Sequence, residues 1–237
     1  LSFFGIILIG VIFGGDSETV EVENNSVIEL NLSDISDDYA GKYSDPWVTA
    51  FSERKKIGLT DVINAIEIAE TDDAIKGISI LNTNSSLGMA QSKELRDALN
   101  RFKKSGKFIY SYANNYSQKE YYLNSVATSI YINPIGELDF KGLSTEVMFF
   151  KDFQEKSGLK MEVIRHGKYK SAVEPFLENK MSDANKEQTM ALLNGIWTNI
   201  VEDISKSRNI PVEKLNTIAN GLLARTPKMA KAQNLID

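Results

Sequence analysis

The segment 165–174 reads RHGKYKSAVE and brings together several side chains that could move a proton. Lysine acts as a general base only where burial or a neighbouring cation lowers its pKa from about 10.4 towards neutrality. Lys170 is followed by the small or apolar run 171–173, which could desolvate it, whereas Lys168 follows a glycine and is expected to be more exposed. From the residues alone, an ordinary surface position is the commoner outcome for both lysines.

Other residue types that support catalysis form weaker patterns. His166 is the only histidine, and no G-x-S-x-G turn accompanies it, so a position at the rim of a site or the end of a strand is favoured over a Ser-His-Asp triad. The acidic pairs at 37–38 and 72–73 stand in polar, turn-like stretches and are expected to be solvated helix ends. Gly88 is isolated, and no glycine-rich phosphate loop is present in the sequence.

Composition excludes several classes of function. The 237 residues contain no cysteine, which rules out thiol catalysis and cysteine-ligated zinc, and a single histidine rules out a multi-histidine metal site. The net charge of −5 arises from 32 acidic and 27 basic residues spread along the chain, so nucleic acid is not expected as a partner. The hydrophobic content of 42% is enough for a sizeable core.

The first fifteen residues, LSFFGIILIGVIFGG, are uncharged and apolar. A membrane-spanning helix needs about 20 apolar residues, so residues 1–15 are interpreted as the outer part of a truncated membrane anchor. A signal-peptide core or a buried strand is the alternative. Residues 16–25 are expected to form a polar tether, and residues 26–237 to form the folded domain.

Strand and helix patterns alternate through the domain. Helices are expected from Thr60 as an N-cap to about 71, over 90–104, 118–127 and 148–156, from Ser182 to about 207, and after Pro211 and Thr226. Strands are expected over 27–32, 75–81, 107–113, 129–132 and 160–165. Short strand-helix-strand units predict an α/β fold with a largely parallel, buried sheet. The long connection 33–56, which contains Trp47 and Phe51, could contact a partner or substrate.

Three stretches carry a family likeness. The run GKYKSAVEPFLENKMS at 167–182 resembles the lysine-bearing segment of bacterial signal peptide peptidase A, also called protease IV, of peptidase family S49. SKELRDALNRFKKSGKFIYSYAN at 92–114 and QKEYYLNSVATSIYINPIGELDFKGL at 118–143 are similar to the regions on either side of its nucleophile. The likeness covers about 26–237, and the apolar start matches the family's anchor.

The resemblance implies a fold similar to the crotonase and Clp protease superfamily and a Ser-Lys dyad with no cofactor. It implies a single-pass protein of the bacterial inner membrane, with its catalytic domain outside the cytoplasm, that degrades cleaved signal peptides. It also implies a ring-like homo-oligomer such as a tetramer. Lys170 would be the general base. The long form of the family has two repeats, the first supplying the lysine and the second the serine.

The resemblance also distinguishes the long form from the short form, in which one repeat supplies both residues. The short form places its serine in an S-G-G-Y-Y turn. Counting back from the paired tyrosines puts Gln118 at the serine position, with Lys119 and Glu120 in place of the glycines. Ser117 lies one position earlier and lacks those glycines, and the short form's Pro-Gly-Gly turn is replaced by NSSLG at 84–88. The chain is therefore expected to be an amino-terminal repeat whose nucleophile comes from a carboxy-terminal repeat.

Two other functions stay open. The chain could be a non-catalytic, anchored oligomerisation scaffold, with the helix 182–207 and the loop around Trp47 forming its interface. An acyl-CoA enzyme of crotonase type is disfavoured by the apolar start and by the lack of a glycine-rich oxyanion turn.

Overall fold

The computed structural model describes residues 22–35, 37–39, 57–82, 84–164, 166–167 and 169–237. The predicted α/β class is confirmed: a parallel sheet has the strand order β1-β2-β3-β4, which is also the order along the chain. The strands are β1 (Ser26–Asn31), β2 (Ile75–Asn82), β3 (Phe108–Ala113) and β4 (Ser129–Ile132). Residues near the carboxyl ends of these strands therefore meet at one edge of the sheet.

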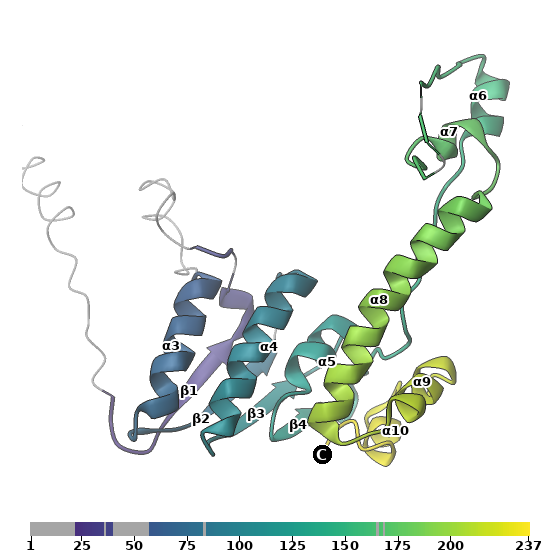
Figure 1. Ribbon diagram of the computed structural model, residues 1–237. Helices are drawn as coiled ribbons and strands as arrows, with labels where there is room; N and C mark the ends of the chain where they lie inside the picture. Colours follow the sequence, from purple (N-terminus) through teal and green to yellow (C-terminus); the bar gives the residue numbers. More distant parts are fainter. Residues whose placement is uncertain (1–21, 36, 40–56, 83, 165, 168) are drawn as a thin grey trace, which may run out of the picture.

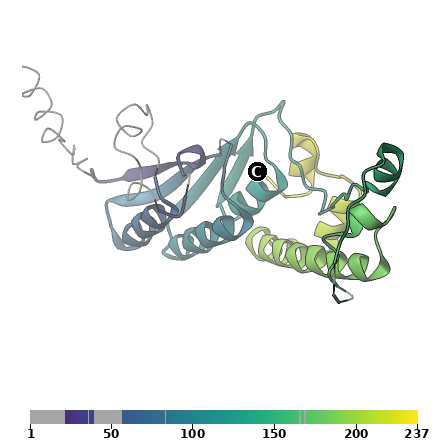
Figure 2. The same cartoon turned by 90° about the horizontal axis from the view of Figure 1, so that it is seen from above.

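Helices cover one face of the sheet and continue into an arm that projects from it (Figure 1; Figure 2). On the body of the molecule are the 3-10 helix η1 (Leu32–Asp34) and the helices α3 (Leu59–Thr71), α4 (Met89–Lys104) and α5 (Gln118–Asn124). The arm carries α6 (Lys151–Ser157) and α7 (Glu174–Leu177) at its far end, and α8 (Asp183–Arg208) runs from below them back to the body. The chain ends with α9 (Val212–Asn220) and α10 (Pro227–Ala232).

The core lies between the sheet and its helices. In α3, residues Leu59, Val62, Ile66 and Ala69 recur at helical spacing and are all buried. They pack in one cluster with the inward residues of the central strands, such as Ile78, Ile80 and Ile109. The hydrophobic pattern thus fixes which side of each element faces inward.

The opposite face of the sheet is open in the part of the chain that the structure describes, so the expectation of a buried sheet is wrong there. Tyr110, Tyr112 and Tyr131 are 44%, 45% and 47% exposed. Strand β3 alternates as a half-buried strand does, with Ile109, Ser111 and Ala113 facing the helices. Aromatic side chains on this open face pack against one another, and the ring centroids of Phe108 and Tyr110 are 4.7 Å apart in a stacked arrangement.

The helix ends confirm some predicted caps and correct others. The hydroxyls of Ser182 and Thr226 accept hydrogen bonds from the third residues of α8 and α10, as predicted. Thr60 is not a cap, because α3 begins one residue earlier at Leu59 after Gly58. Helix α5 ends at Asn124 rather than near residue 127, and α6 begins at Lys151 rather than at residue 148.

The predicted anchor at 1–15, most of the tether, and Trp47 and Phe51 lie outside the described residues. None of the helices in the described ranges combines the length and the apolar character that crossing a membrane requires.

A buried arginine joins three helices. Arg96 of α4 is 1% exposed, and its guanidinium donates to the Tyr122 carbonyl and, at 2.8 Å, to the Ser125 hydroxyl. It also donates to the Asp203 carbonyl at 2.9 Å and to the Ser207 hydroxyl, both in α8. Burial lowers the pKa of this guanidinium, while the neighbouring tyrosines and Asp203 raise it. Four hydrogen-bond acceptors compensate the buried charge, so Arg96 joins the carboxy-terminal part of α8 to the body.

Replacing this arginine should weaken that junction. Arg96→Met leaves buried acceptors on α5 and α8 without a donor, and we expect a loss of about 3 kcal/mol in the free energy of unfolding. Arg101→Met is the control on the same helix. It removes only an exposed ion pair with Glu67, 2.8 Å in length, and should cost under about 1 kcal/mol. Equal losses in urea denaturation of the two variants would contradict the assigned role.

Candidate active site

Lys170, the candidate base, lies on the arm, here defined as the described residues of the range 143–195. The segment around it contacts the start of α8, where the Tyr169 hydroxyl donates to the Glu187 carboxylate at 3.4 Å. The Lys170 side chain is exposed. Its neighbours do not enclose it as expected, because Ala172 is itself exposed and Ser171 and Val173 are only half-buried. A dry environment for this amine would have to come from protein beyond the described residues.

The strand predicted over 160–165 is absent at residues 160–164, which have no regular structure. A strand needs a partner for its backbone groups, and the sheet lies in the body, away from the arm. The Met161 amide instead donates to the Gln154 side chain at 2.8 Å. Ile164 is fully exposed, so the apolar residues that suggested a buried strand remain on the surface.

A buried carboxylate fixes the segment that carries Lys170. Glu174 begins α7 and is 2% exposed. One of its oxygens accepts from the Ser182 hydroxyl at 2.6 Å, and the other accepts from the Ser182 amide at 3.2 Å and the Asn185 side chain at 3.0 Å. Glu174 thus joins α7 to the first turn of α8, where a negative charge is also favoured by the helix dipole. Residue Lys170 lies four positions before this attachment.

Sequence reasoning missed Glu174 as a positioning residue. The available signals were the acidic residue just before Pro175, at the start of a short helix, and the Ser182 cap of the following helix. Neither signal indicates that the two helix starts are joined through one buried carboxylate.

An apolar hollow of about 410 Å³ lies on the same arm. It is lined by Phe150, Phe153, Gln154, Leu159, Lys160, Met161 and Phe176. The rings of Phe150 and Phe176 stack with centroids 5.7 Å apart and hold the outgoing chain against α7. The hollow could receive an apolar side chain of a partner or a substrate.

The region predicted to correspond to a nucleophile holds no Ser-Lys pair among the described residues. Ser117 caps α5, and its hydroxyl donates to the Glu120 carboxylate at 2.8 Å. The ammonium of Lys119 donates to the Leu87 carbonyl. Gln118 binds the backbone of residues 141 and 142 through its amide. The side chain of Gln118 thus has a structural partner and, as an amide, no nucleophilic oxygen to offer.

Backbone amides in the stretch 84–88 also form hydrogen bonds within the chain. The Ser85 amide donates to the Glu120 carboxylate at 3.2 Å, and the Leu87 amide lies 3.4 Å from the Ser85 hydroxyl. An oxyanion site needs amides directed at a substrate oxygen. Here an internal carboxylate takes the Ser85 amide.

The other candidates behave as surface groups. His166 is exposed on the arm. Asp72 accepts from the Ala74 amide at 2.9 Å at the end of α3, and Asp38 accepts from Gln91 at 2.8 Å. Within the described ranges, no three His, Asp or Glu residues are close enough to hold a metal ion.

The Glu174 attachment predicts a local effect on the arm. Glu174→Ala should remove the link between α7 and α8 and destabilise the arm tip by about 2 kcal/mol. Amides of residues 169–182 should then exchange with solvent about thirtyfold faster in hydrogen-exchange mass spectrometry, while amides of the sheet stay protected. Glu178→Ala, an exposed change in the same segment, is the control. Unchanged exchange at the arm tip in Glu174→Ala would show that this carboxylate does not hold it.

Comparison with known proteins gives a family match. Residues 101–237 match the model of Peptidase family S49. "Protease 4" of Haemophilus influenzae is 36% identical over 233 residues, which cover 93% of this chain and 37% of that protein. "Protease 4" of Salmonella typhi is 35% identical over 76% of the chain and 30% of its own length.

A plant relative extends the comparison. "Serine protease SPPA, chloroplastic" of Arabidopsis thaliana is 30% identical over 211 residues, which cover 89% of the chain and 30% of that protein. The chain spans about a third of the length of these relatives. The family match and the extent of these similarities lead to one conclusion: the chain belongs to peptidase family S49, a family of serine peptidases.

Proposed function

We propose that this chain is the amino-terminal, lysine-donating repeat of a two-repeat serine endopeptidase, with Lys170 as its general base. The observation that carries the proposal is that the turn beginning at Gln118, where a nucleophile would be expected, is fully engaged within the chain. The side chains of Gln118, Lys119 and Glu120 are all hydrogen-bonded to backbone groups, while the family membership calls for a peptidase. The relatives' greater length leaves room for a second repeat.

The proposed reaction is acyl transfer. The uncharged amine of Lys170 accepts the proton of a serine hydroxyl from the carboxy-terminal repeat, and the serine oxygen attacks the scissile carbonyl. Lys170 then returns the proton to the leaving amine, which gives an acyl-enzyme. Water attacks the acyl-enzyme with Lys170 again as base, and the serine recovers its proton. Amides of the serine-bearing repeat would bind the oxyanion.

The arm supports a shared site. Several large apolar side chains of the arm are more than half exposed, and such patches mark protein interfaces. They are Met148, Phe153, Leu159, Ile164, Met190 and Leu192. Covering them with another repeat, of the same or a neighbouring chain, would remove water from around Lys170. We extend the proposal to a homo-oligomer, such as a tetramer, built through these contacts.

Substrate, place and superfamily are part of the proposal. Cleaved signal peptides are apolar, which suits a hollow lined by phenylalanine and methionine. The apolar residues 1–15 support attachment to the bacterial inner membrane, with the catalytic domain outside the cytoplasm. Repeated parallel strand-helix units support a fold of the crotonase and Clp protease type.

Changing the candidate base gives the direct test. In the full-length protein, Lys170→Ala should lower kcat for an apolar peptide by about 1,000-fold or more, because the serine loses its proton acceptor. Lys180→Ala, an exposed change ten residues further along, should leave kcat within about twofold. Lys168→Ala should be nearly silent too. Peptidase activity that survives Lys170→Ala with an unchanged pH profile would refute the assignment.

Serine-directed labelling separates the repeats. A fluorophosphonate probe should label no serine of this 237-residue chain, but should label one serine of the full-length protein beyond Asp237. Tryptic mass spectrometry locates the adduct, and Ser117→Ala should not change the labelling. An adduct on Ser117 would show a self-sufficient repeat. Failure to label any serine, together with absent peptidase activity, would favour the non-catalytic scaffold.

A further inference from the structure

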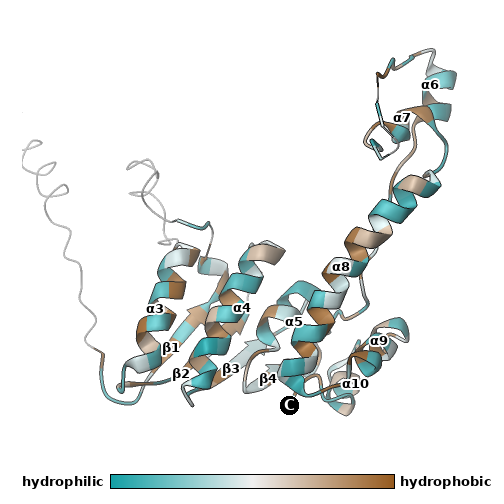
Figure 3. Ribbon diagram, in the orientation of Figure 1, coloured by the Kyte–Doolittle hydropathy of each residue, from teal (hydrophilic) through white to brown (hydrophobic). Residues whose placement is uncertain are grey.

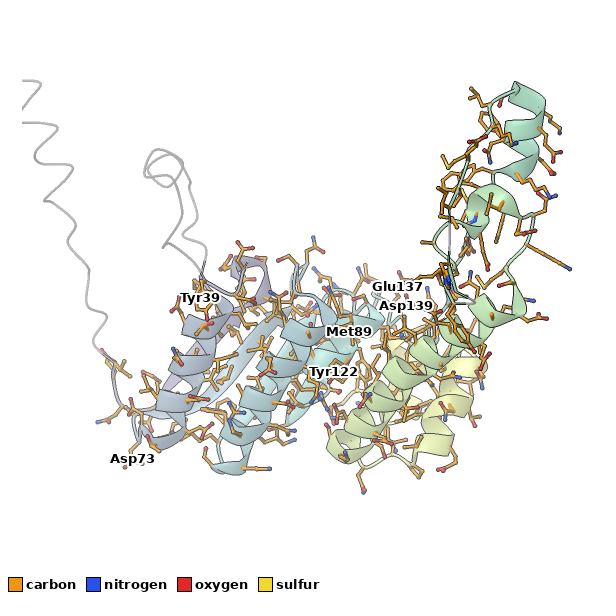
Figure 4. All side chains as sticks on the ribbon, turned by 45° about the horizontal axis from the view of Figure 1, so that its top comes forward. Tyr39, Asp73, Met89, Tyr122, Glu137 and Asp139 are labelled. Atoms are coloured by element: carbon orange, nitrogen blue, oxygen red, sulfur yellow. The ribbon has the colours of Figure 1, made fainter. Side chains whose placement is uncertain are left out.

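Residues 137–142, here called the outgoing leg, lead from the body into the arm and pass beside the start of α5. Residues 137–139 first pair with Tyr116, whose amide donates to the Glu137 carbonyl at 3.0 Å and whose carbonyl accepts from the Asp139 amide at 2.8 Å. Figure 4 shows Glu137 and Asp139 near the foot of the arm. At residues 141 and 142, the backbone is hydrogen-bonded to a side chain instead of to the backbone of another segment.

Gln118 supplies that side chain. Its carbonyl oxygen accepts from the Lys141 amide at 3.0 Å and from the Gly142 amide at 2.8 Å, and its NH2 group donates to the Gly142 carbonyl at 2.9 Å. Gly142 has a φ of +87°, a turn that favours glycine. A carboxamide offers both the acceptor and the donor that this turn needs, whereas a carboxylate has no donor for the Gly142 carbonyl.

The first turn of α5 also binds the loop of residues 84–88. Lys119 donates to the Leu87 carbonyl, and Glu120 accepts from the Ser85 amide at 3.2 Å. We call residues 118–120 the clasp. It is rigidly mounted, because Asn124 in the same helix is buried and bonds to both Ser111 and Asn82 at 2.7 Å.

The arm is attached to the body by two legs. The returning leg, α8, is held to the body by Arg96, and its Trp197 packs against Phe140 of the outgoing leg, with ring centroids 5.5 Å apart. Side chains of the projecting half of α8, such as Met190 and Leu192, are exposed, and Figure 3 shows hydrophobic residues along this helix beyond the body. With the outgoing leg released, the arm could bend about its attachment through α8.

We propose that Gln118 is a positioning residue for Lys170: the clasp fixes where the outgoing leg leaves the body, and so where the arm presents its amine. This inference rests on the proposed function of Lys170. Proton transfer requires the base within hydrogen-bond reach of the hydroxyl, and a displacement of about 1 Å can cost about 100-fold in rate. The clasp is distant in sequence from Lys170 and acts only through the path of the chain.

A distance measurement tests the mechanical part. The 237 residues contain no cysteine, so in the full-length protein, with any cysteine outside them replaced by serine, Lys104→Cys on α4 and Glu155→Cys on α6 provide the pair of thiols for spin labels. The distribution of label separations should be narrow with Gln118, clearly broader in Gln118→Ala, and intermediate in Gln118→Glu, which keeps the acceptor and loses the donor. Tyr121→Phe is the control. It removes a buried hydrogen bond of the same helix, from the tyrosine hydroxyl to the Leu235 carbonyl at 2.8 Å, and keeps the ring that packs against Phe140 of the outgoing leg. Its distribution should stay narrow.

Kinetics of the full-length protein test the catalytic part. Gln118→Ala should lower kcat about tenfold or more with KM within about twofold, Gln118→Glu should recover part of the loss, and Tyr121→Phe should retain kcat. A label distribution unchanged in Gln118→Ala overturns the clasp, whatever Lys170→Ala does. A broader distribution with unchanged kcat, in a protein that Lys170→Ala inactivates, overturns the positioning role. Full activity of Lys170→Ala instead refutes the proposed function, and the catalytic part of this inference with it.

Discussion

An amine takes a proton from a hydroxyl near neutral pH only where burial or a neighbouring cation lowers its pKa. This chain carries its candidate amine, Lys170, exposed on an arm. The described part of the chain does not enclose that amine. The proposed chemistry therefore depends on protein beyond the described residues that closes over the arm. The rest of the structure can be understood as the support that presents the arm.

That support has a stiff body and an open end. Arg96 and the clasp fix the two legs of the arm to a parallel sheet, and Glu174 joins α7 to α8 near the tip. Exposed apolar side chains and the hollow beside Phe150 lie on the part that projects. Rigid attachment limits the entropy lost when a partner binds, so an arm of this kind suits a shared active site.

Sequence patterns predicted the body better than the arm. The parallel sheet, the inward face of α3 and the Ser182 cap followed from local periodicity and capping, because the core that selects them lies within the chain. The pattern at 160–164 predicts a strand that the structure does not have, because the part of the chain that the structure describes provides no burial for it. Counting back from the paired tyrosines identified Gln118 as the residue at the serine position. Its hydrogen bonds to residues 141 and 142 could not be predicted, because they depend on how segments distant in the sequence come together.

The most direct test is the structure of the full-length protein with a phosphonate bound covalently to its serine. The account predicts that the amine of Lys170 lies within hydrogen-bond distance of that serine's oxygen, about 3 Å away, and is enclosed by the other repeat. A Lys170 side chain still surrounded by solvent, with another group beside the serine oxygen, would contradict the account.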